Sequence, residues 1–146
     1  MIKIKEIRQG NLVKTNQGVF KVLESTSLKL CLSPFFSEEV HWRNIEDVSP
    51  VVFNRDIAER LGFEQEGSEA GDDGAMELGN SLMEEGLTFL WVPKAGRYMD
   101  KTSVGLWLYS DYGNEGCKIN IKRVKFVHQI QNLYFALKGK ELKYTP

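Results

Sequence analysis

Short alternations of apolar and polar residues run through the first fifty positions of the chain. Residues 2–5 alternate isoleucine with lysine, and further β-favouring stretches follow at 12–13, 19–23, 28–32 and 39–45. Glycine, asparagine and proline separate these stretches, as expected of turns between strands. This spacing of four or five short strands is typical of a small SH3-like β-barrel.

Two of these predicted strands have clear faces. In the third, Leu28, Leu30 and Leu32 fall on one side, because successive side chains of a strand point to opposite faces. In the fourth, Val40 and Trp42 share a side in the same way. The pattern therefore predicts one apolar face for each of these two strands.

A short helix is predicted directly after Pro50. Asn54 is a favourable N-cap residue, residues 55–61 have helical periodicity, and Gly62 is a favourable stop signal. Arg55 and Glu59 are four residues apart, so they can form an ion pair on the exposed surface of this helix.

An antiparallel meander is predicted from the alternation in residues 87–92, 104–110 and 118–124. In the last of these stretches Ile119 and Ile121 are predicted to point inward. Between the first helix and this meander, residues 75–82 are compatible with either a short helix or a hairpin strand.

The last predicted element is a helix over residues 126–138 that ends at Gly139. Its predicted apolar stripe consists of Phe126, Ile130, Leu133, Tyr134 and Leu137. Because a sheet with one apolar face needs a second layer, we expect this helix to cover the meander. The predicted fold class is therefore α+β, with a barrel subdomain at 1–50 and an α+β subdomain at 51–146.

Charge is distributed unevenly, although the net charge is only −1. Residues 64–85 contain 8 acidic side chains and no lysine or arginine, and a Gly-Asp-Asp-Gly sequence lies at their centre. This composition predicts a flexible acidic insertion. The two ends of the chain are basic, and a candidate basic surface near the last strand consists of Lys118, Lys122, Arg123 and Lys125.

The last helix also carries a polar cluster, formed by His128, Gln129, Gln131 and Asn132. Positions 128, 131 and 132 share one helical face. One interpretation is a site that hydrogen-bonds a ligand. The favoured interpretation is a docking cluster whose side chains bind backbone groups of a neighbouring sheet, because buried polar groups need partners.

Motifs for catalysis, cofactor binding and metal binding are missing from the sequence. It has no Gly-x-Ser-x-Gly and no His-Glu-x-x-His pattern, and Gly113 and Gly116 lie in a predicted loop between strands, where a phosphate cradle is not expected. Cys31 and Cys117 are far apart and belong to no Cys-x-x-Cys pair, so we expect two structural thiols. The sequence therefore predicts a protein without enzymatic activity, cofactor or metal.

Three segments resemble a family of small uncharacterised proteins of gut bacteria and their prophages. The most specific is VHQIQNLYFALKGKEL at residues 127–142, which resembles the C-terminal signature of that family. Residues 7–13 resemble its opening strand, and residues 45–63 its central strand–Pro–helix–Gly–Phe passage. The acidic insertion lies outside the resemblance, which implies a phage or mobile-element setting and no catalytic residues.

Taken together, these patterns predict a cytoplasmic accessory protein that binds another protein. The chain has no apolar run of the length that a membrane span requires, and its start does not have the pattern of a secretory signal. Nucleic-acid binding through the basic ends is the alternative. A protein partner predicts an exposed apolar patch or a free edge strand, whereas nucleic acid predicts a continuous basic stripe.

Overall fold

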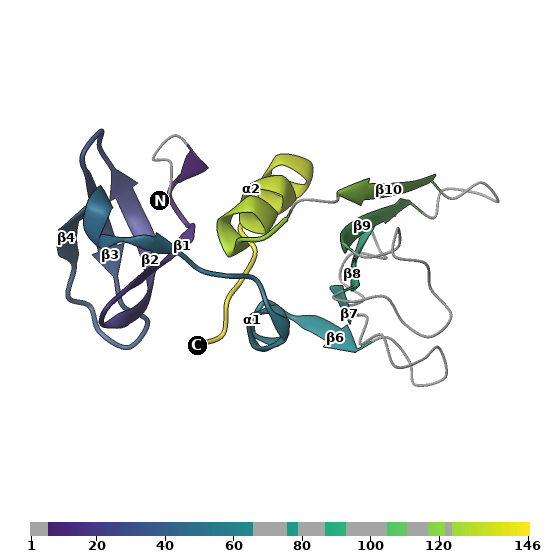
Figure 1. The fold of residues 1–146 in the computed structure, drawn as a ribbon, viewed down its shortest axis with the longest axis horizontal. Coiled ribbons are helices and arrows are strands. Elements are labelled where there is room, and N and C mark those ends of the chain that lie inside the picture. Colours follow the sequence, from purple (N-terminus) through teal and green to yellow (C-terminus); the bar gives the residue numbers. More distant parts are fainter. Residues whose placement is uncertain (1–5, 66–75, 79–86, 93–104, 111–116, 122–123) are drawn as a thin grey trace. The chain divides into compact units, whose positions relative to one another are not determined.

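The computed structural model of the chain describes residues 6–65, 76–78, 87–92, 105–110, 117–121 and 124–146. These residues form an α+β fold of antiparallel sheets and two α-helices (Figure 1). They divide into two compact units, which are described separately. The first consists of Met1–Phe53, Lys125–Leu142 and Pro146, and the second of Asn54–Val124 and Lys143–Thr145.

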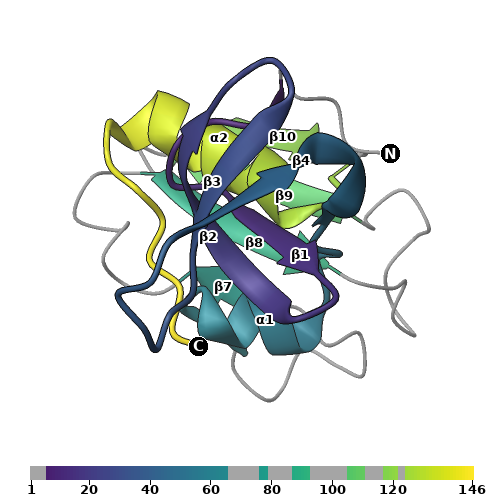
Figure 2. The ribbon, with the colours of Figure 1, turned by 90° about the vertical axis from the view of Figure 1, so that its left-hand side faces the viewer.

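The first unit contains a five-stranded antiparallel sheet in the order β4-β3-β2-β1-β5. Its strands are β1 (Leu12–Thr15), β2 (Gly18–Ser25), β3 (Lys29–Ser33), β4 (His41–Asn44) and β5 (Ser49–Pro50). A 3-10 turn, η2 (Ile45–Asp47), joins the last two. Figure 2 labels β1, β2, β3 and β4 of this sheet. Strands β4 and β5 are the two ends of the order, so the described strands do not form a closed barrel.

One face of this sheet forms a compact core. Val13 pairs with Phe20, and Val22 pairs with Leu32, so these side chains share one side of the sheet. Leu30 lies two residues before Leu32 and joins the same cluster, together with Ile7 and Val48. The predicted alternation of β3 is thus confirmed for Leu30 and Leu32.

Three side chains of the predicted apolar faces are exposed. Leu28 lies before the start of β3, where the chain turns, and Val40 precedes β4. Trp42 lies within β4 and is 46% exposed. Leu28 and Val40 therefore lie just outside the strands predicted to contain them, and the apolar face predicted for the fourth strand is exposed at Trp42, because no second layer of described residues covers it.

The C-terminal helix α2 (Val127–Lys138) belongs to this first unit. It contacts β1, and its start is tied to the chain after β5 by hydrogen bonds from Val127 N to Val51 O (3.0 Å) and from Phe53 N to Lys125 O (2.9 Å). Gly139 ends the helix in the left-handed conformation, as predicted. The sequence predicts that this helix covers the meander, whereas the structure assigns it to the unit of the N-terminal sheet, where it contacts β1.

The buried face of α2 differs from the predicted stripe. Ile130 and Tyr134 are buried as expected, but Leu133 is half-buried and Leu137 is 46% exposed. Two polar side chains, His128 and Gln131, are buried instead. Compared with the predicted stripe, the buried face of the helix is therefore shifted toward His128 and Gln131, which hydrophobic periodicity does not identify.

The second unit begins with helix α1 (Arg55–Arg60). The Asn54 side chain accepts a hydrogen bond from Ile57 N at 3.0 Å, Gly62 has φ +86°, and Arg55 pairs with Glu59 at 3.2 Å. The predicted cap, stop signal and ion pair are thus confirmed. The helix is one residue shorter than predicted.

A five-stranded antiparallel meander completes the second unit, in the order β10-β9-β8-β7-β6. Its strands are β6 (Phe63–Gln65), β7 (Met76–Leu78), β8 (Leu87–Val92), β9 (Gly105–Ser110) and β10 (Cys117–Ile121). The ambiguous stretch at 75–82 thus contributes a strand. Ile119 is exposed, contrary to the predicted inward position, whereas Phe89 and Leu106 are fully buried. Most of the acidic insertion lies outside the described residues.

Candidate functional site

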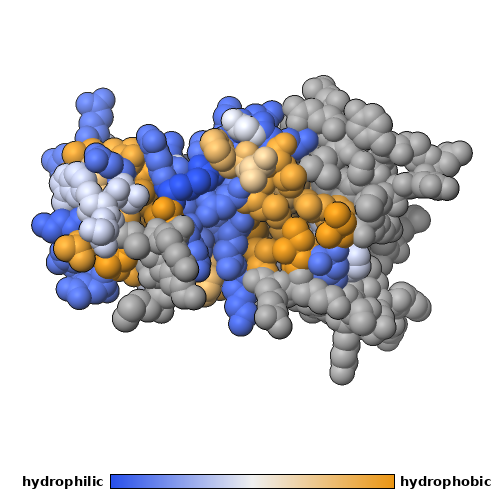
Figure 3. Space-filling view, turned by 90° about the horizontal axis from the view of Figure 1, so that it is seen from above, coloured by the Kyte–Doolittle hydropathy of each residue, from blue (hydrophilic) through white to orange (hydrophobic). Residues whose placement is uncertain are grey.

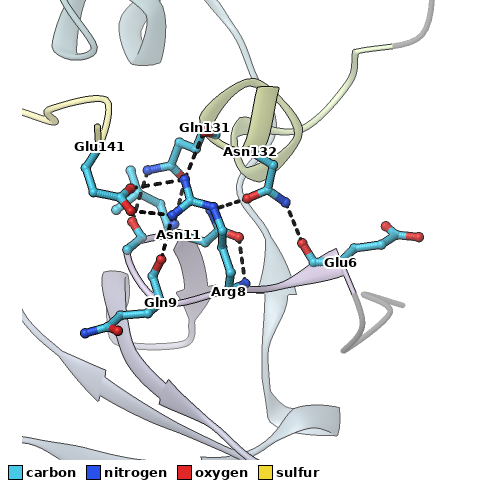
Figure 4. A network of polar contacts seen from close by, with 9 residues as sticks. Glu6, Arg8, Gln9, Asn11, Gln131, Asn132 and Glu141 are labelled. Carbon is cyan, nitrogen blue, oxygen red and sulfur yellow. Dashed lines mark hydrogen bonds and ion pairs between the residues drawn. The ribbon is translucent and has the colours of Figure 1, made fainter. Parts of the chain in front are cut away.

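The polar cluster of α2 holds the segment Glu6–Leu12 against the helix, entirely within the first unit (Figure 4). Gln131 is its central residue and is 1% exposed. Its side-chain oxygen accepts a hydrogen bond from Leu12 N at 2.8 Å, and its side-chain nitrogen donates to Gly10 O at 3.2 Å. The side-chain amide of Gln131 thus binds two main-chain groups, Leu12 N and Gly10 O, at the start of β1.

Asn132 extends this contact by one residue along the helix. Its side-chain oxygen accepts a hydrogen bond from the Asn11 side chain at 2.9 Å, and its nitrogen donates to Glu6 O at 2.7 Å. Asn11 is itself buried, and its oxygen accepts from Arg8 N at 3.0 Å, closing a tight turn. Two successive helix residues therefore bind both sides of the turn.

Gln129 has a different role. Its side-chain oxygen accepts hydrogen bonds from Lys125 N at 2.9 Å and from Phe126 N at 3.2 Å, at the first turn of α2. Side-chain acceptors at this position satisfy amide groups that the helix leaves free. Gln131 and Asn132 therefore both bind the segment Glu6–Leu12, whereas Gln129 caps the first turn of α2.

His128 is buried without a hydrogen bond among the described residues. It is 1% exposed, and its ring stacks on Phe126 with the centroids 5.8 Å apart. Its Nε2 atom lies 3.7 Å from a carboxylate oxygen of Glu6, which is longer than a hydrogen bond. Burial lowers the pKa of His128 below its ordinary value of 6.5, and the charge of Glu6 opposes this shift only in part.

Replacing His128 with phenylalanine should reduce the acid sensitivity of the fold. Because the pKa is lowered in the folded state, stability due to neutral His128 is full above about pH 6.5 and is lost as pH falls toward the folded-state pKa. The variant should lose less stability than the wild type between pH 7.5 and 5, by at most about 1.4 kcal/mol per pH unit, the limit for one proton. Urea unfolding across this pH range measures the difference.

The matched control is His41→Phe, at the other, half-buried histidine of the same unit. It should keep the acid sensitivity assigned to His128, because His128 is unchanged in this variant. Equal slopes for wild type and His128→Phe would contradict the assignment of this acid sensitivity to His128.

An ion pair that the sequence did not predict lies beside this cluster. The Arg8 guanidinium binds both carboxylate oxygens of Glu141, which follows the end of α2. The same guanidinium donates to Gln9 O and to Gln131 O, each at 2.9 Å, and its carbon lies 4.1 Å from the centroid of the Phe135 ring. One feature of the sequence singles out Glu141 as a candidate for an ion pair: it is the single acidic residue after position 115.

A pocket of about 420 Å³ opens next to this ion pair. Its lining includes Arg8, Lys21, Leu23, Phe135 and Glu141, all from the first unit. The volume is within the usual range for small-molecule sites. The pocket thus combines two cationic groups, an aromatic and an aliphatic wall, and one carboxylate.

The candidate basic surface is largely outside what the structure describes. Lys122 and Arg123 are not among the described residues, and of Lys118 only the backbone in β10 is described. Lys125 is exposed next to the first turn of α2. Nucleic-acid binding by this set therefore stays a prediction.

The described segments contain neither a metal-binding group of side chains nor a helix that could span a membrane. In them, no three histidine, cysteine, aspartate or glutamate residues are grouped so that they could bind a metal ion, and neither helix is long and apolar enough to cross a membrane. Cys31 is a buried free thiol on β3, as the sequence led us to expect, and the side chain of Cys117 is not described.

Comparison with known proteins adds no family assignment. A scan against protein-family models and searches of curated proteins and of solved structures found no match to this chain. The resemblance of residues 127–142 to a family of gut-bacterial and prophage proteins therefore stays a prediction.

Proposed function

We propose that this protein is a non-enzymatic, protein-binding module that adds an extended segment of its partner to strand β4. The observation that supports this proposal is the combination of a terminal strand and exposed apolar side chains at one place. Strand β4 is an end of the sheet order, Phe36 just before it is 87% exposed, and Val40 and Trp42 are exposed as well. In Figure 3, apolar residues reach the surface of the N-terminal sheet, at the left.

The two faces of β4 have different roles. His41 pairs with Leu32 and Arg43 with Leu30, so both lie on the core side of the sheet, and the His41 ring meets the edge of Phe20 with the centroids 6.4 Å apart. Trp42 pairs with Cys31 and lies on the opposite side. The core-side contacts hold the strand in place, while the indole is left half-exposed as an anchor for a partner.

Charge complementarity indicates the chemistry of the partner. Glu38 and Glu39 before β4, and Glu46 and Asp47 after it, are exposed. A segment added at this edge forms main-chain hydrogen bonds with β4 and places alternate side chains on each face. We infer a partner segment with apolar residues at alternate positions and with lysine or arginine on its flanks.

Three further parts of the proposal rest on the sequence. The number and close spacing of short strands in the first unit support an SH3-like type of module, although the described strands do not close into a barrel. The resemblance supports an accessory role in a phage or mobile element. A cytoplasmic location is the third of these expectations.

Selection from a displayed library of random 12-residue peptides tests the proposal. We expect enriched peptides to alternate apolar residues, to carry basic flanks and to shift the backbone amide signals of β4. Trp42→Ser should weaken their binding at least 10-fold, because aromatic anchors contribute disproportionately to such interfaces. Isothermal titration calorimetry with the enriched peptides measures the loss.

The matched control is Leu137→Ser, because Leu137 on α2 has the same exposed fraction as Trp42, 46%. It should bind the peptides as the wild type does. Equal losses in both variants, or enriched peptides without basic flanks, would contradict the proposal.

Fluorescence anisotropy with labelled DNA and RNA at two salt concentrations tests the alternative. Phosphate contacts release counterions, so nucleic-acid binding must weaken steeply with salt. We expect only weak association, and salt-sensitive binding below micromolar concentration would refute the choice of a protein partner.

A further inference from the structure

The pocket beside Arg8 has the features of a binding site that is independent of the β4 edge. It measures about 420 Å³, and its lining comes from the segment before β1, from β2, from α2 and from the chain after α2. Leu23 and Phe135 are apolar, and Arg8 and Lys21 are cationic. This combination fits a ligand with an apolar body and a negative group.

Arg8 is oriented by contacts other than the one with Glu141. Its two terminal nitrogens donate to Gln9 O and Gln131 O, each at 2.9 Å, and the guanidinium lies over the Phe135 ring. Main-chain carbonyls and an aromatic ring thus fix the plane of the guanidinium. A planar guanidinium held in this way binds a carboxylate through two parallel hydrogen bonds.

The position that such a carboxylate would take is filled by Glu141. Its two oxygens accept from the two terminal nitrogens of Arg8, and its side chain is 39% exposed (Figure 4). Gly10 leaves room for this group, because a Cβ atom at position 10 would lie 2.6 Å from the Glu141 carboxyl. The pair is partly exposed, so water and salt screen its attraction, and an outside carboxylate that forms the same two hydrogen bonds can take the place of Glu141.

We propose that this pocket binds a small ligand with a carboxylate and an apolar body, and that Glu141 occupies the carboxylate position when no ligand is bound. The ligand carboxylate would bind Arg8, and its apolar body would lie against Leu23 and Phe135. Lys21 adds a second positive charge. Because Glu141 is tethered to the site, it competes at high effective concentration and weakens ligand binding in the intact chain.

Titration of the full-length protein with hexanoate, followed by backbone amide NMR, tests this inference. We expect saturable shifts at Gly10, Leu23 and Phe135. Glu141→Gln keeps the side-chain size but removes the competing charge, so it should bind hexanoate at least 10-fold more tightly than the wild type. Adding Arg8→Lys to this variant should reverse the gain, because lysine lacks the two-pronged geometry.

The controls separate carboxylate recognition from other effects. Hexanamide, the neutral analogue, should not bind, and inorganic phosphate should bind more weakly than hexanoate because it has no apolar body. Glu59→Gln breaks the exposed ion pair with Arg55 on α1 and should leave hexanoate binding unchanged. Equal binding of hexanoate and hexanamide, stronger binding of phosphate, or no saturable shift in a folded Glu141→Gln variant overturns the proposal.

If Glu141→Gln does not give the dispersed spectrum of a folded protein, the wild type decides. Hexanoate must then shift the same three amides, and Lys21→Gln must weaken the binding. Absence of either effect overturns the proposal. Trp42 does not line the pocket, so the Trp42→Ser variant should bind hexanoate as the wild type does. The two proposals can therefore fail independently of each other.

Discussion

Gln131→Ala should lower the free energy of unfolding by about 3–5 kcal/mol. The substitution removes the acceptor of Leu12 N and the donor to Gly10 O, and both groups are buried in the first unit. A buried main-chain group without a partner costs about 1–3 kcal/mol, and two such groups together with the space left by the side chain give this range. Urea unfolding followed by circular dichroism measures the change.

Two variants of the same helix serve as controls. Leu137→Ala truncates an exposed side chain and should change stability by less than about 0.5 kcal/mol. Gln131→Glu keeps an oxygen for Leu12 N but has no donor for Gly10 O at neutral pH, so its loss should be intermediate. A loss below about 1 kcal/mol for Gln131→Ala would mean that α2 does not depend on this amide for its contact with β1.

Gly10→Ala should cost about 2–4 kcal/mol, for two separable reasons. Gly10 has φ +90°, where a residue with a Cβ atom is strained by about 1–2 kcal/mol. The added Cβ would also lie 2.6 Å from the Glu141 carboxyl, so Glu141 must leave Arg8. Urea unfolding measures the total cost.

Gly18→Ala and a double substitution separate the two contributions. Gly18 also has a positive φ, of +128°, but a Cβ atom there would have no neighbour within 4 Å, so its replacement costs backbone strain alone. In a Glu141→Ala background, Gly10→Ala should likewise cost only strain. If Gly10→Ala costs the same in the wild-type and Glu141→Ala backgrounds, the carboxyl is not held where the structure has it.

The local sequence determined where most elements begin and end. Asn54 and Gly62 bound α1, Gly139 ends α2, and the alternation around Leu30 and Leu32 marks β3. These signals are local because caps, stop residues and strand periodicity act over a few neighbouring residues. The α+β class follows from them without further information.

The exposed face of each element was decided by tertiary structure. Trp42 and Ile119 alternate as core residues do, yet they are exposed, because alternation does not indicate whether a second layer covers that face. On α2, Leu137 fits the apolar stripe, but the helix buries Gln131 instead. The amide is stabilised there by two main-chain groups about 120 positions earlier in the chain.

The candidate pocket depends on the same kind of distant contact. The positions of Arg8 and Glu141 differ by 133, and no local pattern in the sequence pairs them. The sequence alone determined most of the strands, helices and turns, although it left residues 75–82 undecided, and it identified Gln131 and Asn132 as a polar set. Only the folded chain decided that Arg8, Phe135 and Glu141 meet, because hydrogen bonds and ion pairs between distant segments depend on where the backbone brings them and leave no periodic pattern in either segment.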